Sequence, residues 1–155
     1  MTEQLSLTDV QRSVVGDRIT KIRCVYYVLG DTIQSRNGPV EVTVSNRARV
    51  VFDAGPDGEE LVCREGPWLD PFADVGTGRD PEGEAENARY IAEYGKWTVF
   101  DADEGSDVSA LVGHSVEALT VDTGAGGKPV TAVFELGDRS LVLAAMGDEL
   151  VTTVR

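Results

Sequence analysis

The second half of this chain repeats the outline of its first half, and the repeated outline is typical of β-strands. Each half has a Val-Gly pair followed by spaced apolar positions, then Pro-Val with alternating apolar residues, then two short apolar runs. The first half holds these as Val15-Gly16-x-x-Ile19-x-x-Ile22, Pro39–Val44, Val50–Phe52 and Glu60–Val62, and the second as Val112-Gly113-x-x-Val116-x-x-Leu119, Pro129–Phe134, Leu141–Leu143 and Glu149–Val151. Two related strand units of this kind predict one β-body, with the segment between them as an insertion.

Strand signals run through both units. Apolar residues alternate with others in Ile22–Val28 and in Val40–Val44, so each stretch has one core face, and Glu41 is expected on the opposite face. Gly30-Asp31 is typical of a two-residue hairpin turn. We expect strands at about 22–28, 32–36, 40–45, 48–54, 59–65, 96–102, 115–121, 130–136, 140–145 and 149–154. Short strands with turns between them predict a mainly β, antiparallel fold, either a barrel or a sandwich.

The inserted segment contains the one helix that the sequence predicts, at about residues 81–94. Asp80 can cap its first turn, Pro81 suits the first helical position, and Gly95 is a natural stop. Apolar residues recur at spacings of three and four, which predicts an amphipathic helix with a thin apolar stripe. The stripe consists of Ala85, Ala88, Ile91, Ala92 and Tyr94.

A chain of 155 residues has the usual size of one domain. We divide it into a first β unit (14–65), an acidic insertion (66–110) and a second β unit (111–155). The N-terminal residues lack the basic and apolar regions of a secretory signal, and no apolar run approaches the roughly 18 residues that cross a bilayer. A cytoplasmic location is therefore expected, with Cys24 and Cys63 as buried free thiols.

The net charge of −13 is concentrated in the middle of the chain. Residues 53–107 carry four Lys/Arg and sixteen Asp/Glu, a net charge of −12, whereas residues 1–52 carry +2 and residues 108–155 carry −3. Such a field repels nucleic-acid phosphates and anionic membranes, and it accelerates encounter with a basic partner. The alternative is that the acidic loops only keep the protein soluble.

Three local groups resemble functional motifs without meeting them. An EF-hand loop starting at Asp101 would need glycine and glutamate where the chain has Ser106 and Val112. The loop 124–128 lacks the first glycine and the Ser or Thr of a phosphate-binding loop, so a hairpin loop is expected there. His114, the only histidine, has no neighbouring nucleophile and no cysteine pair spaced for zinc. We therefore expect no metal, no cofactor and no catalytic residue, which favours a protein that is not an enzyme.

Aromatic residues gather in the acidic insertion. Pro67–Phe72 and Gly95–Phe100 contain both tryptophans and half of the four phenylalanines. Such residues either pin the insertion onto the β-body or form a recognition surface, in which neighbouring carboxylates pair with arginines of a partner. The candidate binding residues are Trp68, Asp70, Phe72, Asp74, Trp97, Asp101, Asp103 and Glu104.

Three functional hypotheses follow. The first is a non-catalytic binding protein that engages a basic protein partner through the acidic segment, as an inhibitor or immunity-type protein against a basic enzyme would. The second is a β-barrel that encloses a small molecule, as an isomerase or cyclase, with Tyr26, Tyr27, Trp68 and Trp97 as walls. The third is a structural module without a ligand. An exposed sheet edge would also permit a homodimer.

Overall fold

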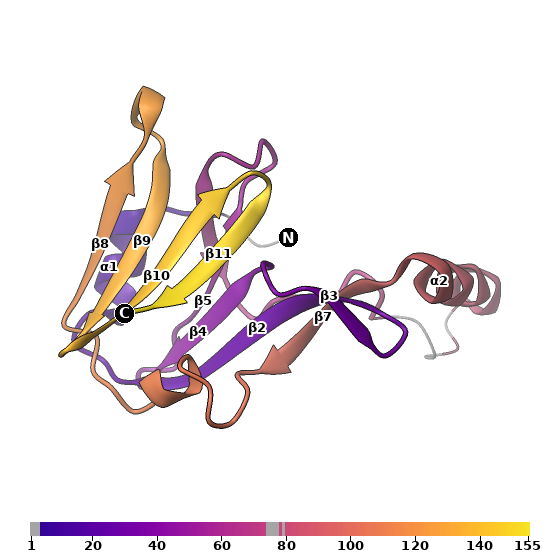
Figure 1. The fold of residues 1–155 in the computed structure, drawn as a ribbon, viewed down its shortest axis with the longest axis horizontal. Coiled ribbons are helices and arrows are strands. Elements are labelled where there is room, and N and C mark those ends of the chain that lie inside the picture. Colours follow the sequence, from indigo (N-terminus) through magenta and orange to yellow (C-terminus); the bar gives the residue numbers. More distant parts are fainter. Residues whose placement is uncertain (1–3, 74–77, 79) are drawn as a thin grey trace.

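The computed structural model describes residues 4–73, 78 and 80–155. It consists of two antiparallel β-sheets that pack face to face, and an arm that extends from one of them (Figure 1). The mainly β, antiparallel class is confirmed. The sheets form an open, sandwich-like arrangement and not a closed barrel.

The larger sheet has seven strands in the order β1-β6-β5-β4-β2-β3, and β7 also pairs with β2. All of its pairings are antiparallel. Its strands are β1 (Gln4–Leu5), β2 (Ile19–Leu29), β3 (Thr32–Ser35), β4 (Val40–Val44), β5 (Arg49–Ala54), β6 (Leu61–Glu65) and β7 (Lys96–Asp101).

The smaller sheet is a four-stranded meander in the order β11-β10-β9-β8. Its strands are β8 (Ala118–Thr123), β9 (Pro129–Leu136), β10 (Arg139–Met146) and β11 (Glu149–Val154). The glycine-rich loop between β8 and β9 holds the short 3-10 helix η2 (Ala125–Gly127), and a second one, η1 (Ser109–Leu111), precedes β8. The expected strands are thus present, with ends that differ by at most three residues.

Two α-helices accompany the sheets. α2 (Pro81–Tyr94) has the predicted bounds, and the Asp80 side chain accepts a hydrogen bond from Gly83 N as its cap. α1 (Leu7–Val14) was not expected from the sequence, because eight residues give too short a periodic pattern. Ser6 caps it, and Val10 and Val14 are fully buried. No helix among the described residues is long and apolar enough to span a membrane.

The space between the sheets is filled by aliphatic and aromatic side chains from both. Phe52 of β5 and Phe134 of β9 meet edge to face, with ring centroids 5.4 Å apart. Cys24 and Cys63 are free and buried, as expected, and burial raises the pKa of Cys63 to about 12. Other fully buried core side chains are Val10, Val14, Ile19, Val42, Leu111, Val116, Ala132, Leu141 and Leu143.

Backbone hydrogen bonds join the start of β2 to the segment before β8 in a reciprocal pattern, which we call the clasp (residues 16–19 and 113–116). Gly16 N–H donates to Val116 O (2.8 Å) and Gly113 N–H to Ile19 O (2.7 Å). Two more bonds follow the same exchange, from Ile19 N–H to His114 O (2.9 Å) and from Val116 N–H to Asp17 O (2.8 Å). Both glycines have positive φ, +91° and +97°, which other residues adopt only with strain.

The arm consists of residues 25–35 and 80–101. Strand β2 is 11 residues long, and only its first part, from Ile19 to Cys24, pairs with β4. Its outer part pairs with β3 on one side and with β7 on the other. These three strands project beyond the sandwich, and α2 lies at the far end (Figure 1).

The clasp predicts that alanine is poorly tolerated at its two glycines. We expect Gly16→Ala and Gly113→Ala each to lower the free energy of unfolding by about 1–2 kcal/mol, because a Cβ is disfavoured at positive φ. Val15→Ala is the matched control: Val15 is 40% exposed, and its truncation should cost less than about 0.5 kcal/mol. Urea denaturation measures all three. Glycine variants no less stable than the Val15 variant would contradict the role of the clasp.

Candidate interaction surface on the arm

Five aromatic side chains meet where α2 joins β7. Tyr27 and Trp97 pack edge to face, with ring centroids 5.2 Å apart. Phe72 stacks on Tyr90 at 5.9 Å, and Tyr90 lies 4.9 Å from Tyr94. Together with Pro71, Gly95 and Lys96, four of them (Tyr27, Phe72, Tyr90 and Trp97) line a pocket of about 220 Å³. We call this group the aromatic cluster.

The local sequence holds this cluster in place. The Tyr27 hydroxyl donates to Tyr94 O at 2.5 Å, which ties the end of α2 to β2. Gly95 has a φ of +81°, and a Cβ there would overlap the carbonyl of Val28, so glycine permits the direct turn from α2 into β7. A Cβ at Gly38 would likewise overlap the Trp97 ring. Glycine at these two positions therefore sets how closely the arm packs.

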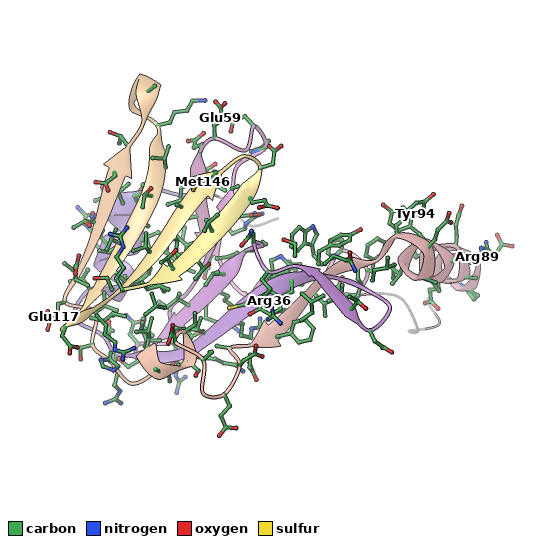
Figure 2. The ribbon with its side chains drawn as sticks, viewed as in Figure 1. Arg36, Glu59, Arg89, Tyr94, Glu117 and Met146 are labelled. Carbon is green, nitrogen blue, oxygen red and sulfur yellow. The ribbon has the colours of Figure 1, made fainter. Side chains whose placement is uncertain are left out.

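The surface of α2 is almost entirely exposed. The helix has no buried residue, so the apolar stripe expected to face the core is not covered by the described part of the chain. Only Gly83, Glu84 and Ile91 are half-buried. Tyr90 and Tyr94 are 49% and 52% exposed, and Tyr94 and Arg89 are seen at the far end of the arm (Figure 2).

Large exposed hydrophobic side chains concentrate on this part of the molecule. Among the described residues, nine such side chains are exposed, and five of them lie on the arm. A sixth, Leu69, is in the segment leading to it and is 67% exposed. The five on the arm are Ile33, Tyr90, Tyr94, Trp97 and Phe100. A concentration of exposed aromatic side chains is more often found at interaction sites than single exposed residues are.

A buried ion pair at the base of the arm fixes the segment that carries Trp68. The Arg23 guanidinium donates two hydrogen bonds to Glu41, at 2.5 Å (Nε) and 2.8 Å (Nη2), and Trp68 N–H donates to Glu41 Oε1 at 2.8 Å. Burial alone would raise the pKa of Glu41, but Arg23 and the Trp68 amide together hold that pKa below its ordinary value. The bond to Glu41 in turn raises the pKa of Arg23.

The Glu41 side chain is only 2% exposed, which its expected place opposite the core did not indicate. It does lie on the face of the larger sheet opposite the core, as the alternation predicted. Val25 and Val51 are fully buried on that same face. Glu41 therefore acts as an anchor beneath the chain that crosses this face, and not as a surface charge.

Of the candidate binding residues, the structure brings together Phe72 and Trp97, with Asp70 beside them. Asp70 receives a bond from Lys96 Nζ at 2.6 Å and one from Phe72 N at 2.8 Å. Trp68 is half-buried and lines a separate pocket of about 120 Å³ with Arg64, Pro67 and Leu69. The two tryptophans therefore do not share a site.

The remaining acidic candidates lie where β7 returns to the sandwich. Asp101 pairs with Lys21 at 3.3 Å and Asp103 with Arg36 at 3.5 Å, and all four side chains are more than half exposed. Arg36 also lies over the Tyr26 ring, 4.9 Å from its centroid. Glu104 is exposed, and Asp74 lies outside the described residues.

Tyr90 and Lys96 contribute to the aromatic cluster, Glu41 anchors the segment that carries Trp68, and all three were missed as site residues. Tyr90 and Tyr94 are four positions apart and so lie one helical turn apart, which is a signal that the sequence contains. Lys96 is held in the cluster by Asp70, which lies 26 positions earlier in the chain. Contacts over that separation leave no local pattern in the sequence.

Elsewhere in the described chain, the candidate sites have fewer features of a binding site. A surface pocket of about 390 Å³ lies along β5 and β6, where burial raises the pKa of Asp53, which also pairs with Arg64 at 3.2 Å. Within the described residues, no group of three or more His, Cys, Asp or Glu is arranged to hold a metal ion. The aromatic residues expected to line a barrel interior lie instead on the arm or on the outer face of the larger sheet.

Three comparisons with known proteins were negative. No protein-family model matches the chain, and neither a curated protein nor a solved structure matches it.

The buried ion pair predicts a large effect of one substitution. We expect Glu41→Gln to lower the free energy of unfolding by about 2–4 kcal/mol, because it leaves the half-buried Arg23 without its carboxylate. Asp101→Asn is the matched control: its pair with Lys21 is exposed and should contribute less than about 1 kcal/mol. Chemical denaturation measures both variants.

The same pair predicts a pH dependence. Because the folded-state pKa of Glu41 lies below 4.5, its contribution is present above about pH 4.5 and is lost as the pH falls through the folded-state value. The stability difference between the wild type and Glu41→Gln should therefore shrink between pH 7 and about pH 3. A difference that stays constant over this range would show that the charge of Glu41 is not what stabilises the segment.

Proposed function

We propose that this chain is a non-catalytic binding protein whose arm engages a basic protein partner. The observation that carries the proposal is the exposure of α2: a 14-residue helix held away from the sandwich with none of its residues buried. Helices in proteins gain most of their stability from packing an amphipathic face, and isolated helices of this length are marginal in water. A partner that covers α2 and the aromatic cluster would supply that packing.

The side chains around α2 fit recognition of a protein. Tyr and Trp are the residues most often found as anchors in interfaces, because they bury a large area and lose little conformational entropy. Tyr90, Tyr94 and Trp97 are each between a third and a little over a half exposed. They are held by neighbouring rings, so little order has to be created on binding.

The charge of the arm supports a basic partner. Helix α2 carries four glutamates, Glu82, Glu84, Glu86 and Glu93, against the single cation Arg89. Aromatic anchors next to carboxylates suit a partner surface that combines apolar side chains with Arg or Lys. Such a surface would be steered to the arm by charge and retained by apolar burial.

We also propose that the two strand groups are related units. In each, four antiparallel strands are neighbours in one sheet, β2-β4-β5-β6 in one and β8-β9-β10-β11 in the other, and in the first group β3 lies between β2 and β4 in the chain. The clasp supports this relation, because residues 97 positions apart make equivalent hydrogen bonds: Gly16 donates to Val116, and Gly113 donates to Ile19.

A binding survey tests the proposed function. We expect immobilised protein to retain partners from a set of basic proteins and not from a size-matched acidic set, and the retained affinity to fall at least about tenfold between 50 and 300 mM salt. The double variant Glu86→Lys/Glu93→Lys should weaken that binding about tenfold or more. Tyr90→Ser/Tyr94→Ser should do the same through lost apolar contact.

Two variants on the sandwich serve as controls. Glu117 and Met146 are exposed and lie far from the arm (Figure 2), so Glu117→Lys and Met146→Ser should change affinity by less than about twofold. Equal losses in the control and arm variants would place binding elsewhere. Binding that is indifferent to salt and to the sign of the partner's charge would refute the proposal.

A further inference from the structure

Strand β7 leaves one of its edges unpaired. It pairs with β2 along Lys96–Asp101, and no described residue pairs with its other side. The opposite edge of the same sheet ends in β1, a strand of two residues. The β7 edge, with six residues, is therefore longer than the edge strands β1 and β3, which have two and four, and in Figure 1 it lies on the outside of the arm.

The hydrogen-bond pattern shows which backbone groups are available there. Ala102 N–H donates to Ile22 O (3.0 Å), so this pair is a hydrogen-bonded one. In an antiparallel ladder such pairs alternate with non-bonded pairs. On the far side of β2, Val25 N–H donates to Pro39 O (2.9 Å), away from β7. It follows that the N–H and C=O groups of Trp97, Val99 and Asp101 point away from β2.

The composition of this edge is unusual for a strand exposed to solvent. Native proteins protect open edges with lysines, prolines, bulges or short strands. Here Trp97–Phe100 contains no charge, proline or glycine, and both of its aromatic residues are more than a third exposed. The flanking Lys96 is drawn to Asp70, and its side chain is only 25% exposed. The edge thus retains the features that favour pairing with another strand.

We propose that β7 binds an extended, basic segment of a partner protein as an added strand. This inference rests on the proposed function and names its mode of binding: main-chain hydrogen bonds to Trp97, Val99 and Asp101, with side-chain contacts on both faces of the arm. On one face the added strand would lie beside Trp97 and Val99, which share the face of the aromatic cluster. On the other it would lie beside Thr98 and Phe100.

The negative charge beside β7 favours an added strand that is basic. Residues 96–107 contain one lysine and four carboxylates, and all four carboxylates are exposed. Asp101 and Asp103 pair with Lys21 and Arg36, and Glu104 and Asp107 add further negative charge. An extended segment passing along this edge therefore runs beside negative charge, which Arg or Lys side chains would neutralise. A second copy of this chain would instead bring its own net charge of −13 and its own acidic arm. The basic segment is favoured over self-pairing for that reason.

A peptide probe tests this mode. The probe is the alternating peptide acetyl-Arg-Val-Lys-Val-Arg-Val-Lys-amide, and its comparison is the same peptide with Glu in place of Arg and Lys. We expect the basic peptide to bind, the acidic one not to bind, and the basic peptide to slow hydrogen exchange of the Trp97, Val99 and Asp101 amides about tenfold or more. Exchange is measured on the wild-type protein and so does not depend on a variant that folds.

Two substitutions at Val99 distinguish the contribution of its backbone amide to peptide binding from that of its side chain. Val99→Pro removes an amide that points away from β2, and proline is tolerated at a strand edge when its nitrogen faces solvent. It should weaken peptide binding at least about tenfold, whereas Val99→Ala, which keeps the amide, should weaken it less than about threefold.

The outcomes distinguish this inference from the proposed function. Absence of peptide binding, or binding that is equal in Val99→Pro and leaves the three amides unprotected, would refute strand addition at β7. Basic proteins could still be retained through α2 in either case, and the proposed function would stand. Amides already protected in the free protein, with a dimer in sedimentation, would identify a second copy as the occupant and overturn the basic segment.

Discussion

The reciprocal hydrogen bonds of the clasp are the constraint on which the two-sheet body depends. They join the beginning of β2 to the segment that leads into β8, and these are the first strands of the two strand groups. Each exchange needs a glycine at positive φ, at Gly16 and at Gly113, so a local backbone property decides how two distant parts of the chain meet. Two positions before each of these glycines, Val14 and Leu111 are fully buried. The clasp thus closes the end of the core where both strand groups start.

The arm follows from the length of one strand. Beginning at the clasp, β2 contributes Ile19, Ile22 and Cys24 to the core, and then continues past the sandwich, where Tyr26 and Tyr27 support the arm. The Arg23–Glu41 pair lies at this transition, on the face opposite the core, and holds the chain that crosses it. A surface built on a continuation of a core strand is well ordered, and this lowers the entropic cost of binding.

The sequence predicted local features well and long-range burial poorly. The bounds of α2 were confirmed because Asp80, Pro81 and Gly95 act within one turn of the helix. The exposure of its apolar stripe could not be predicted, because periodicity shows that a helix has an apolar face but not whether another segment covers that face. The burial of Glu41 could not be predicted for a related reason: alternation assigns a residue to a face of a sheet, while the segment that covers Glu41 contributes Trp68, 27 positions further along.

The exposed arm is difficult to explain by the stability of this chain alone. Tyr90, Tyr94, Trp97 and Phe100 would each contribute most if buried, yet all are more than a third exposed, while the sandwich fills its own core with Val, Leu and Phe. A Cβ at Gly95 would overlap the Val28 carbonyl, and a Cβ at Gly38 would overlap the Trp97 ring. Glycine at these positions therefore permits α2 and Trp97 to pack close to β2. Aromatic side chains that are fixed in place and open to solvent would suit the proposed binding function, since the order is created at folding and a partner would bury the exposed apolar area.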